Sequence, residues 1–118
     1  MESGRLIYWV DDLRDPKDFL LDRKKGDTVF WLKDYESFVR RVIDYGVPDV
    51  IWLDHDLGED KSGKDCANFL VDYCLDHALK LPDYHSQSQN PVGKENIVKL
   101  FESYNKFYKE NIEDGNLH

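Results

Sequence analysis

The chain has 118 residues, and its 16 lysines and arginines stand against 24 aspartates and glutamates, which gives a formal net charge of −8. A chain of this length with 41% hydrophobic residues forms one small domain around one core. The acidic excess disfavours non-specific binding to a long nucleic acid. The sequence contains no apolar run near the roughly 20 residues of a membrane span, and its polar start lacks a signal peptide's apolar stretch. We therefore expect one cytoplasmic domain over residues 1–118, with no membrane partner.

Three short apolar segments predict β-strands. Residues 6–10 (LIYWV) and 50–53 (VIWL) are continuous apolar runs followed directly by acidic residues, and residues 28–32 (TVFWL) are β-branched and aromatic. Apolar runs without alternation are typical of strands that are covered on both faces. A fourth, weaker strand is expected within residues 79–86.

Three long helices are expected between and after these strands. The first begins after Asp34 as its N-cap and ends at Gly46, the second follows the loop 57–63, and the last begins with Asn90 as N-cap and Pro91 in its first turn. Apolar residues at helical spacing predict their buried faces. These residues are Phe38, Val39, Val42 and Ile43 in the first helix, Cys66, Phe69, Leu70, Tyr73, Cys74 and His77 in the second, and Ile97, Leu100, Phe101, Tyr104 and Tyr108 in the last.

The alternation of strands and helices predicts an α/β fold with a parallel sheet and helices on both of its faces. Residues 15–25 fit either a short helix or an ordered loop, and the tail from about residue 111 is expected to fray. Cys66 and Cys74 would lie roughly 12 Å apart along one helix, which is too far for a disulfide, so we expect both to be reduced core residues.

Acidic residues follow two of the predicted strands. Asp11 and Asp12 come directly after the first strand, and Asp54 and Asp56 follow the strand at residues 50–53. Because the carboxyl ends of parallel strands meet at one edge of the sheet, we expect Asp11, Asp12 and Asp54 to converge there. Carboxylate oxygens suit a hard divalent cation, with Mg²⁺ preferred and Mn²⁺ as the alternative, and Asp56 is a further candidate ligand. One acidic strand end is often only a solvated loop, but two on neighbouring strands favour a metal site.

The period of a strand places His55 on the opposite side from Asp54 and Asp56. Its imidazole is therefore either a partner of the metal ligands or a general acid or base.

The polar segment 84–96 runs into the start of the last helix, where free backbone N–H groups attract anions. Gly93 would let a ligand approach the backbone, and His85 and Ser86 are expected at the same edge as the aspartates. Alone, the segment also fits an ordinary capped turn. Together with the aspartates it predicts a phosphate site, whose candidate ligands are Ser86, Asn90, Gly93, Lys94 and Asn96.

These residues resemble the receiver domains of two-component response regulators. In that resemblance Asp11 and Asp12 match the metal-binding acids, Asp54 matches the phosphoacceptor, and Ser86 approximates the hydroxyl residue after the fourth strand. The sequence departs from the pattern because it has no fifth strand carrying that family's lysine, and Lys94 is not a convincing substitute.

The sequence is more closely similar to the cyclic-phosphate processing receiver domains. The similarity lies in residues 9–16 (WVDDLRDP), 53–58 (LDHDLG), and 85–86 (HS) followed by 90–96 (NPVGKEN), and it spans nearly the whole chain. It implies a three-layer receiver-like (flavodoxin-like) fold, with about four parallel strands in the order 2-1-3-4 and without a fifth strand and helix. It also implies a role on cyclic phosphates.

Three functions are compatible with these patterns. The first is a metal-dependent phosphoesterase that processes a cyclic phosphate, either a 2′,3′-cyclic end such as an RNA end or a cyclic nucleotide. In it, Asp54 would ligate the metal or attack phosphorus, His55 or His85 would move protons, and Ser86 would hold phosphate oxygens. The second is a signalling receiver that is phosphorylated at Asp54, and the third is a non-catalytic binder of phosphorylated or cyclic nucleotides.

Overall fold

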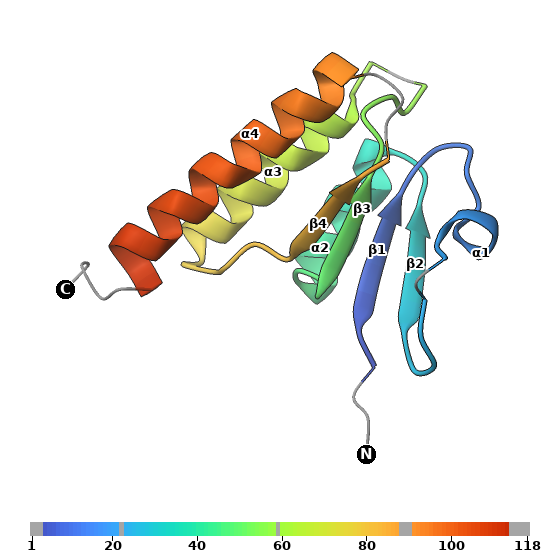
Figure 1. The fold of residues 1–118 in the computed structure, drawn as a ribbon, viewed down its shortest axis with the longest axis horizontal. Coiled ribbons are helices and arrows are strands. Elements are labelled where there is room, and N and C mark those ends of the chain that lie inside the picture. The colour runs from blue at the N-terminus through green and yellow to red at the C-terminus, as the bar shows by residue number, and fades with distance from the viewer. Residues whose placement is uncertain (1–3, 22, 59, 88–90, 114–118) are drawn as a thin grey trace.

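The computed structural model describes residues 4–21, 23–58, 60–87 and 91–113 (Figure 1). Four parallel strands form one sheet in the order β2-β1-β3-β4. The strands are β1 (Leu6–Val10), β2 (Thr28–Leu32), β3 (Val50–Leu53) and β4 (Asp83–Ser86). The predicted parallel sheet and its strand order are confirmed, and the described residues contain no fifth strand.

The three long helices share one hydrophobic core with one face of the sheet. They are α2 (Tyr35–Tyr45), α3 (Gly63–Asp76) and α4 (Pro91–Tyr108), and α3 and α4 run side by side along the edge of the sheet near β4 (Figure 1). Their buried side chains pack against Tyr8 and Val10 of β1 and the equivalent residues of β3. This face is therefore covered as the sequence predicts.

The opposite face of the sheet has much less helical cover. It carries the single-turn helix α1 (Pro16–Phe19), which Asp15 caps, and the buried Leu20 packs beside it. Across this face a row of aromatic side chains occupies matching positions on all four strands: Trp31, Trp9, Trp52 and His85. The expectation of helices on both faces is thus met by only one turn of helix on this side, and large rings bury part of the surface that a longer helix would cover.

The helix boundaries follow from local capping. Asp34 caps α2 through the backbone N–H of Ser37, and Gly46 ends it with a positive φ of 89°, as the sequence predicts. Ile43 was expected to face the core, but its side chain is 60% exposed. It follows Val42 by one residue, a rotation of about 100° around the helix, which turns it away from the buried stripe.

In α3 both cysteines are buried and neither forms a disulfide, as predicted, whereas His77 is the exposed C-cap residue rather than part of the buried stripe. Helix α4 continues into one π-helical turn at Lys109–Glu113. The predicted N-cap Asn90 and residues 114–118 lie outside the described residues. None of the described helices combines the length and apolar character needed to cross a membrane.

Candidate functional site

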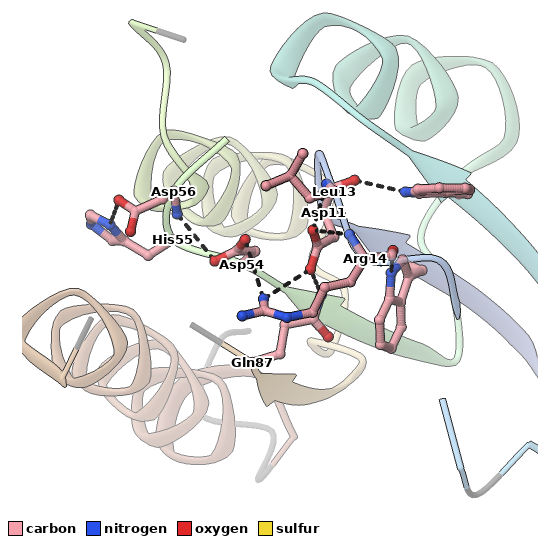
Figure 2. Close-up of polar contacts among 9 residues, drawn as sticks. Asp11, Leu13, Arg14, Asp54, His55, Asp56 and Gln87 are labelled. Atoms are coloured by element: carbon pink, nitrogen blue, oxygen red, sulfur yellow. Dashed lines mark hydrogen bonds and ion pairs between the residues drawn. The ribbon is translucent and has the colours of Figure 1, made fainter. Parts of the chain in front are cut away.

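A pocket of about 340 Å³ lies at the carboxyl ends of β1 and β3. Seven residues line it: Asp11, Asp12, Leu13, Arg14, Asp54, Asp56 and Gly58. Figure 2 shows the polar contacts among the side chains at its centre. The pocket contains all four aspartates that the sequence predicted as metal ligands.

Three carboxylates come together in this pocket as expected. Asp11, Asp12 and Asp54 each offer an oxygen atom, and these atoms lie within 4.8 Å of one another. The sheet holds two of the residues in place, because the Asp54 N–H donates to the carbonyl of Val10 and the Asp11 N–H donates to that of Leu32. Three converging anionic oxygens form a donor set that suits a hard divalent cation.

The Asp11 carboxylate is fully buried and uses both of its oxygens in hydrogen bonds (Figure 2). Its Oδ1 accepts from the backbone N–H groups of Leu13 and Arg14, each at 2.9 Å. Its Oδ2 accepts from Gln87 Nε2 at 2.7 Å and from Arg14 Nη1 at 3.3 Å. Asp11 therefore fixes the shape of the loop after β1 and also faces the pocket.

Asp54 is 7% exposed, and burial raises its pKa to about 6. The negative charges of Asp11 and Asp12 also contribute to this raised value, whereas the N–H of Asp56 and the charge of Arg14 oppose it. The Asp56 side chain is exposed, and its carboxylate lies 3.2 Å from Nδ1 of His55. Asp54 is thus the buried carboxylate that follows β3, and Asp56 is an exposed residue of the pocket lining.

Two indole groups support the loop that carries Arg14. Trp9 Nε1 donates to the carbonyl of Arg14 at 2.8 Å, and Trp31 Nε1 donates to the carbonyl of Asp11 at 2.7 Å. Both rings belong to the aromatic row on the sparsely covered face of the sheet. That row therefore positions the pocket as well as filling the sheet surface.

Strand β4 brings two polar side chains to the same edge of the sheet. Ser86 pairs in register with Leu53, the residue before Asp54, and Gln87 follows Ser86. Ser86 Oγ and Gln87 Oε1 are buried and have no hydrogen-bond partner within the described structure. A buried hydroxyl without a partner is costly, so Ser86 Oγ at this edge of the sheet fits a group that binds a polar ligand, although Ser86 is not among the residues that line the acidic pocket. Gln87 and Arg14 were not predicted as site residues, although Arg14 lies within the motif at residues 9–16.

The imidazole of His55 occupies the space that the sequence assigned to a ligand near Gly93. A Cβ atom on Gly93 would lie 2.4 Å from Cγ of His55. Gly93 therefore accommodates a histidine in this structure, and the expected approach of a ligand to its backbone stays a prediction. Lys94 and Asn96 are exposed on α4 and do not line the pocket, and Asn90 lies outside the described residues.

His85 also lies apart from the aspartates. Its ring stacks on that of Trp52 at a centroid distance of 4.2 Å, on the face of the sheet opposite to Ser86. It is exposed and does not line the acidic pocket. His85 and Ser86 both lie at the carboxyl end of β4, as expected, but their side chains lie on opposite faces of the sheet because neighbouring strand residues alternate between faces.

Comparison with known proteins agrees with this architecture. A family model of the cyclic-phosphate processing receiver domain matches residues 6–103. The chain belongs to this family. No curated protein sequence matches it.

Solved structures similar to this receiver domain include response regulators. One is a LuxR-family two-component response regulator from Aurantimonas sp. SI85-9A1, with 19% identity, a TM-score of 0.60, and coverage of 83% of this chain and 69% of that chain. Another is the N-terminal domain of a response regulator/sensory box/GGDEF 3-domain protein from Carboxydothermus hydrogenoformans, with 22% identity, a TM-score of 0.56, and coverage of 91% and 98%. At these identities the likeness establishes the receiver fold alone.

The acidic pocket of this receiver domain contains a basic side chain that was not predicted from the sequence. Among the residues that line the acidic pocket, Arg14 is the basic one, and it comes from the loop after β1. The described residues contain no fifth strand that could carry a lysine, and Arg14 supplies a cation from the loop after β1.

Proposed function

We propose that this receiver domain is a metal-dependent phosphoesterase that opens a cyclic phosphate through attack by Asp54. The observation that carries the proposal is the cluster of Asp11, Asp12 and Asp54 oxygens within 4.8 Å at the edge of the sheet. The description of the family supports cyclic phosphates as the substrate class.

The residues of the pocket fit a hydrated divalent cation, Mg²⁺ or Mn²⁺. Asp11, Asp12 and Asp54 would hold it, since hard cations take carboxylate oxygens together with waters and phosphate oxygens. When bound, such a cation neutralises phosphate charge and orients the attacking group. The buried Ser86 hydroxyl, which has no partner among the described residues and lies at the same edge of the sheet, would donate to a non-bridging phosphate oxygen.

The proposed reaction proceeds in two displacements at phosphorus. The Asp54 carboxylate forms a bond to phosphorus, one ring P–O bond breaks, and the ring oxygen leaves with the electron pair and takes a proton from water. Water then attacks phosphorus, the bond to Asp54 breaks, and the carboxylate is restored as a proton passes to solvent. The product is a ring-opened phosphate monoester.

A phosphoacceptor role is the second candidate, and one observation favours it. No imidazole is among the described residues that line the pocket, so neither His55 nor His85 is placed there to protonate the leaving oxygen. A receiver that accepts a phosphoryl group at Asp54 from a good donor needs no such acid.

One incubation separates these functions. The protein is mixed with Mg²⁺ or Mn²⁺ and a panel of 2′,3′- and 3′,5′-cyclic phosphates, and separately with acetyl phosphate. Mass spectra are recorded of the small molecules and of the intact protein. Ring-opened product in excess over protein supports the phosphoesterase, and it identifies the substrate class.

Matched variants complete this experiment. Asp54→Asn removes the nucleophile, whereas Asp44→Asn removes an exposed carboxylate on α2 and serves as the control. One added phosphoryl group per wild-type chain, without turnover of any cyclic phosphate, would instead establish the phosphoacceptor. Binding of a cyclic phosphate with neither reaction would make the domain a non-catalytic binder.

A further inference from the structure

The guanidinium of Arg14 lies between two of the clustered carboxylates. Its Nη1 atom is 3.3 Å from Asp11 Oδ2 and 3.6 Å from Asp54 Oδ2 (Figure 2). One nitrogen therefore bridges one oxygen of each aspartate. These contacts are longer than the 2.7 Å hydrogen bond from Gln87 to Asp11, so the Arg14 contacts are the weaker ones at this carboxylate.

A divalent cation that is held by Asp11 and Asp54 would need the place that this nitrogen occupies. Asp11 Oδ1 already accepts two backbone N–H groups, whereas Asp11 Oδ2 accepts Gln87 Nε2 and shares the Arg14 nitrogen with Asp54 Oδ2. The Arg14 side chain is 23% exposed and lines the pocket, whereas its backbone N–H donates to Asp11 and its carbonyl accepts from Trp9. The guanidinium can thus move without disturbing the loop.

We propose that Arg14 and a divalent cation alternate between Asp11 and Asp54, and that the displaced guanidinium then binds the oxygens of the phosphoryl group. Without the cation, Arg14 offsets the repulsion between the buried carboxylates. With the cation bound, the guanidinium remains anchored at the rim of the same pocket, where its planar donors match phosphate oxygens. Arg14 is then the residue that makes phosphate binding depend on prior metal binding.

This inference rests on the proposed function only in taking a divalent cation as the ligand of the aspartates. It applies equally to a phosphoesterase and to a phosphoacceptor, since both bring a phosphoryl group to Asp54. The test therefore measures binding and does not depend on turnover.

The decisive variant is Arg14→Met, which removes the guanidinium and retains the backbone that Asp11 and Trp9 hold. Arg40→Met is the matched control, because Arg40 is an exposed arginine on α2 that pairs with Glu36. Mn²⁺ binding is measured by electron paramagnetic resonance of the free ion. Binding of beryllofluoride, a mimic of an aspartate-bound phosphoryl group, is measured in saturating Mg²⁺ by ¹⁹F NMR.

We expect Arg14→Met to bind Mn²⁺ about fivefold more tightly than wild type. In wild type the cation must first break the partly exposed ion pairs of Arg14, and such pairs contribute only a modest free energy. The same variant should bind beryllofluoride about tenfold more weakly, since it has lost a charged donor. Arg14→Lys should fall between wild type and Arg14→Met in both measurements. Arg40→Met should match wild type in both.

A direct observation of the guanidinium distinguishes displacement from simple charge repulsion. In wild type, ¹⁵N signals of the Arg14 side chain should shift toward those of a free arginine when Mg²⁺ saturates the site, and shift again with beryllofluoride. Signals that do not move with Mg²⁺ would overturn the inference. So would Mn²⁺ affinity that is equal or weaker in Arg14→Met.

The two proposals fail in different ways. If Arg14→Met behaves as expected but no cyclic phosphate turns over, the inference stands and the phosphoesterase proposal fails. If wild type and Arg14→Met bind Mn²⁺ equally and cyclic phosphate still turns over, the inference alone fails. If neither wild type nor Arg14→Met binds Mn²⁺, both the phosphoesterase proposal and the inference about Arg14 fail.

Discussion

The imidazole of His55 lies directly against Gly93 in the first turn of α4, where a Cβ atom would come within 2.7 Å of three of its ring atoms. His55 follows the buried Asp54, and Gly63 at the start of α3 packs against the carbonyl of the same aspartate. Two glycines thus let two helix starts approach the segment that carries the central carboxylate. This close packing fixes the position of Asp54.

Gly93→Ala should destabilise the protein by about 1–3 kcal/mol, because the added methyl group overpacks the contact with His55. The sign of this change in the free energy of unfolding is informative, because alanine within a helix is otherwise favoured over glycine by about 1 kcal/mol. In a His55→Ala background the same substitution should be neutral or stabilising. Urea unfolding of the four proteins measures this coupling, and additive effects would contradict the proposed contact.

Ser86→Ala should separate stability from ligand binding. Removing a buried hydroxyl that has no partner should leave the free energy of unfolding unchanged or slightly raised. Binding of beryllofluoride in Mg²⁺ should weaken about tenfold, because a donor to the phosphoryl oxygens is lost.

Ser37→Ala provides the control with the opposite pattern. Ser37 belongs to the capping box of α2, so its loss should lower stability by about 1 kcal/mol and leave ligand binding unchanged. Loss of stability in Ser86→Ala with normal ligand affinity would show that the hydroxyl is structural. Thermal unfolding and ¹⁹F NMR on both variants distinguish these results.

Local sequence patterns were sufficient to predict much of the fold. Apolar runs followed by acids identified β1 and β3, and the capping residue and terminal glycine of α2 fixed its ends. These signals act within a few residues, so they can be recognised without knowing the tertiary structure. The convergence of Asp11 and Asp54 followed because parallel topology brings strand ends together.

Contacts between distant segments could not be predicted in the same way. Gln87 reaches Asp11 from the far side of β3, and His55 fills the space beside Gly93, but neither pair has a local sequence signal. The unequal cover of the two sheet faces was also missed. An uninterrupted apolar strand predicts burial, but it does not tell whether helices or tryptophan rings provide that burial.

His85→Ala should leave the metal-dependent reaction within about twofold of wild type, since histidine must be within hydrogen-bond reach to transfer a proton. The structure instead stacks His85 on Trp52, so the variant should lose about 0.5–1 kcal/mol of stability and change the tryptophan fluorescence. Steady-state turnover and chemical unfolding are measured on the same preparation. A large fall in turnover with normal stability would show that His85 takes part in the reaction.

Asp54 should make the metal-free protein less stable as pH rises. Its pKa is about 6 in the folded protein against a reference value of 3.8, so folding favours the protonated carboxyl group. The stabilising contribution is complete below pH 4 and is lost as pH rises through 6, because the folded state then gives up a proton that the unfolded state has already released. Asp54→Asn has no such titration.

The difference in unfolding free energy between Asp54→Asn and wild type should therefore grow from pH 4 to pH 7 in favour of the variant, by about 1–2 kcal/mol after allowance for solvent screening. Denaturant unfolding in a metal chelator at several pH values measures this difference. The chelator is essential, because bound cation would stabilise the ionised form and reverse the trend. Parallel pH curves for the two proteins would mean that burial does not perturb the Asp54 carboxyl group, and the geometry assigned to the pocket would then have to be revised at its central residue.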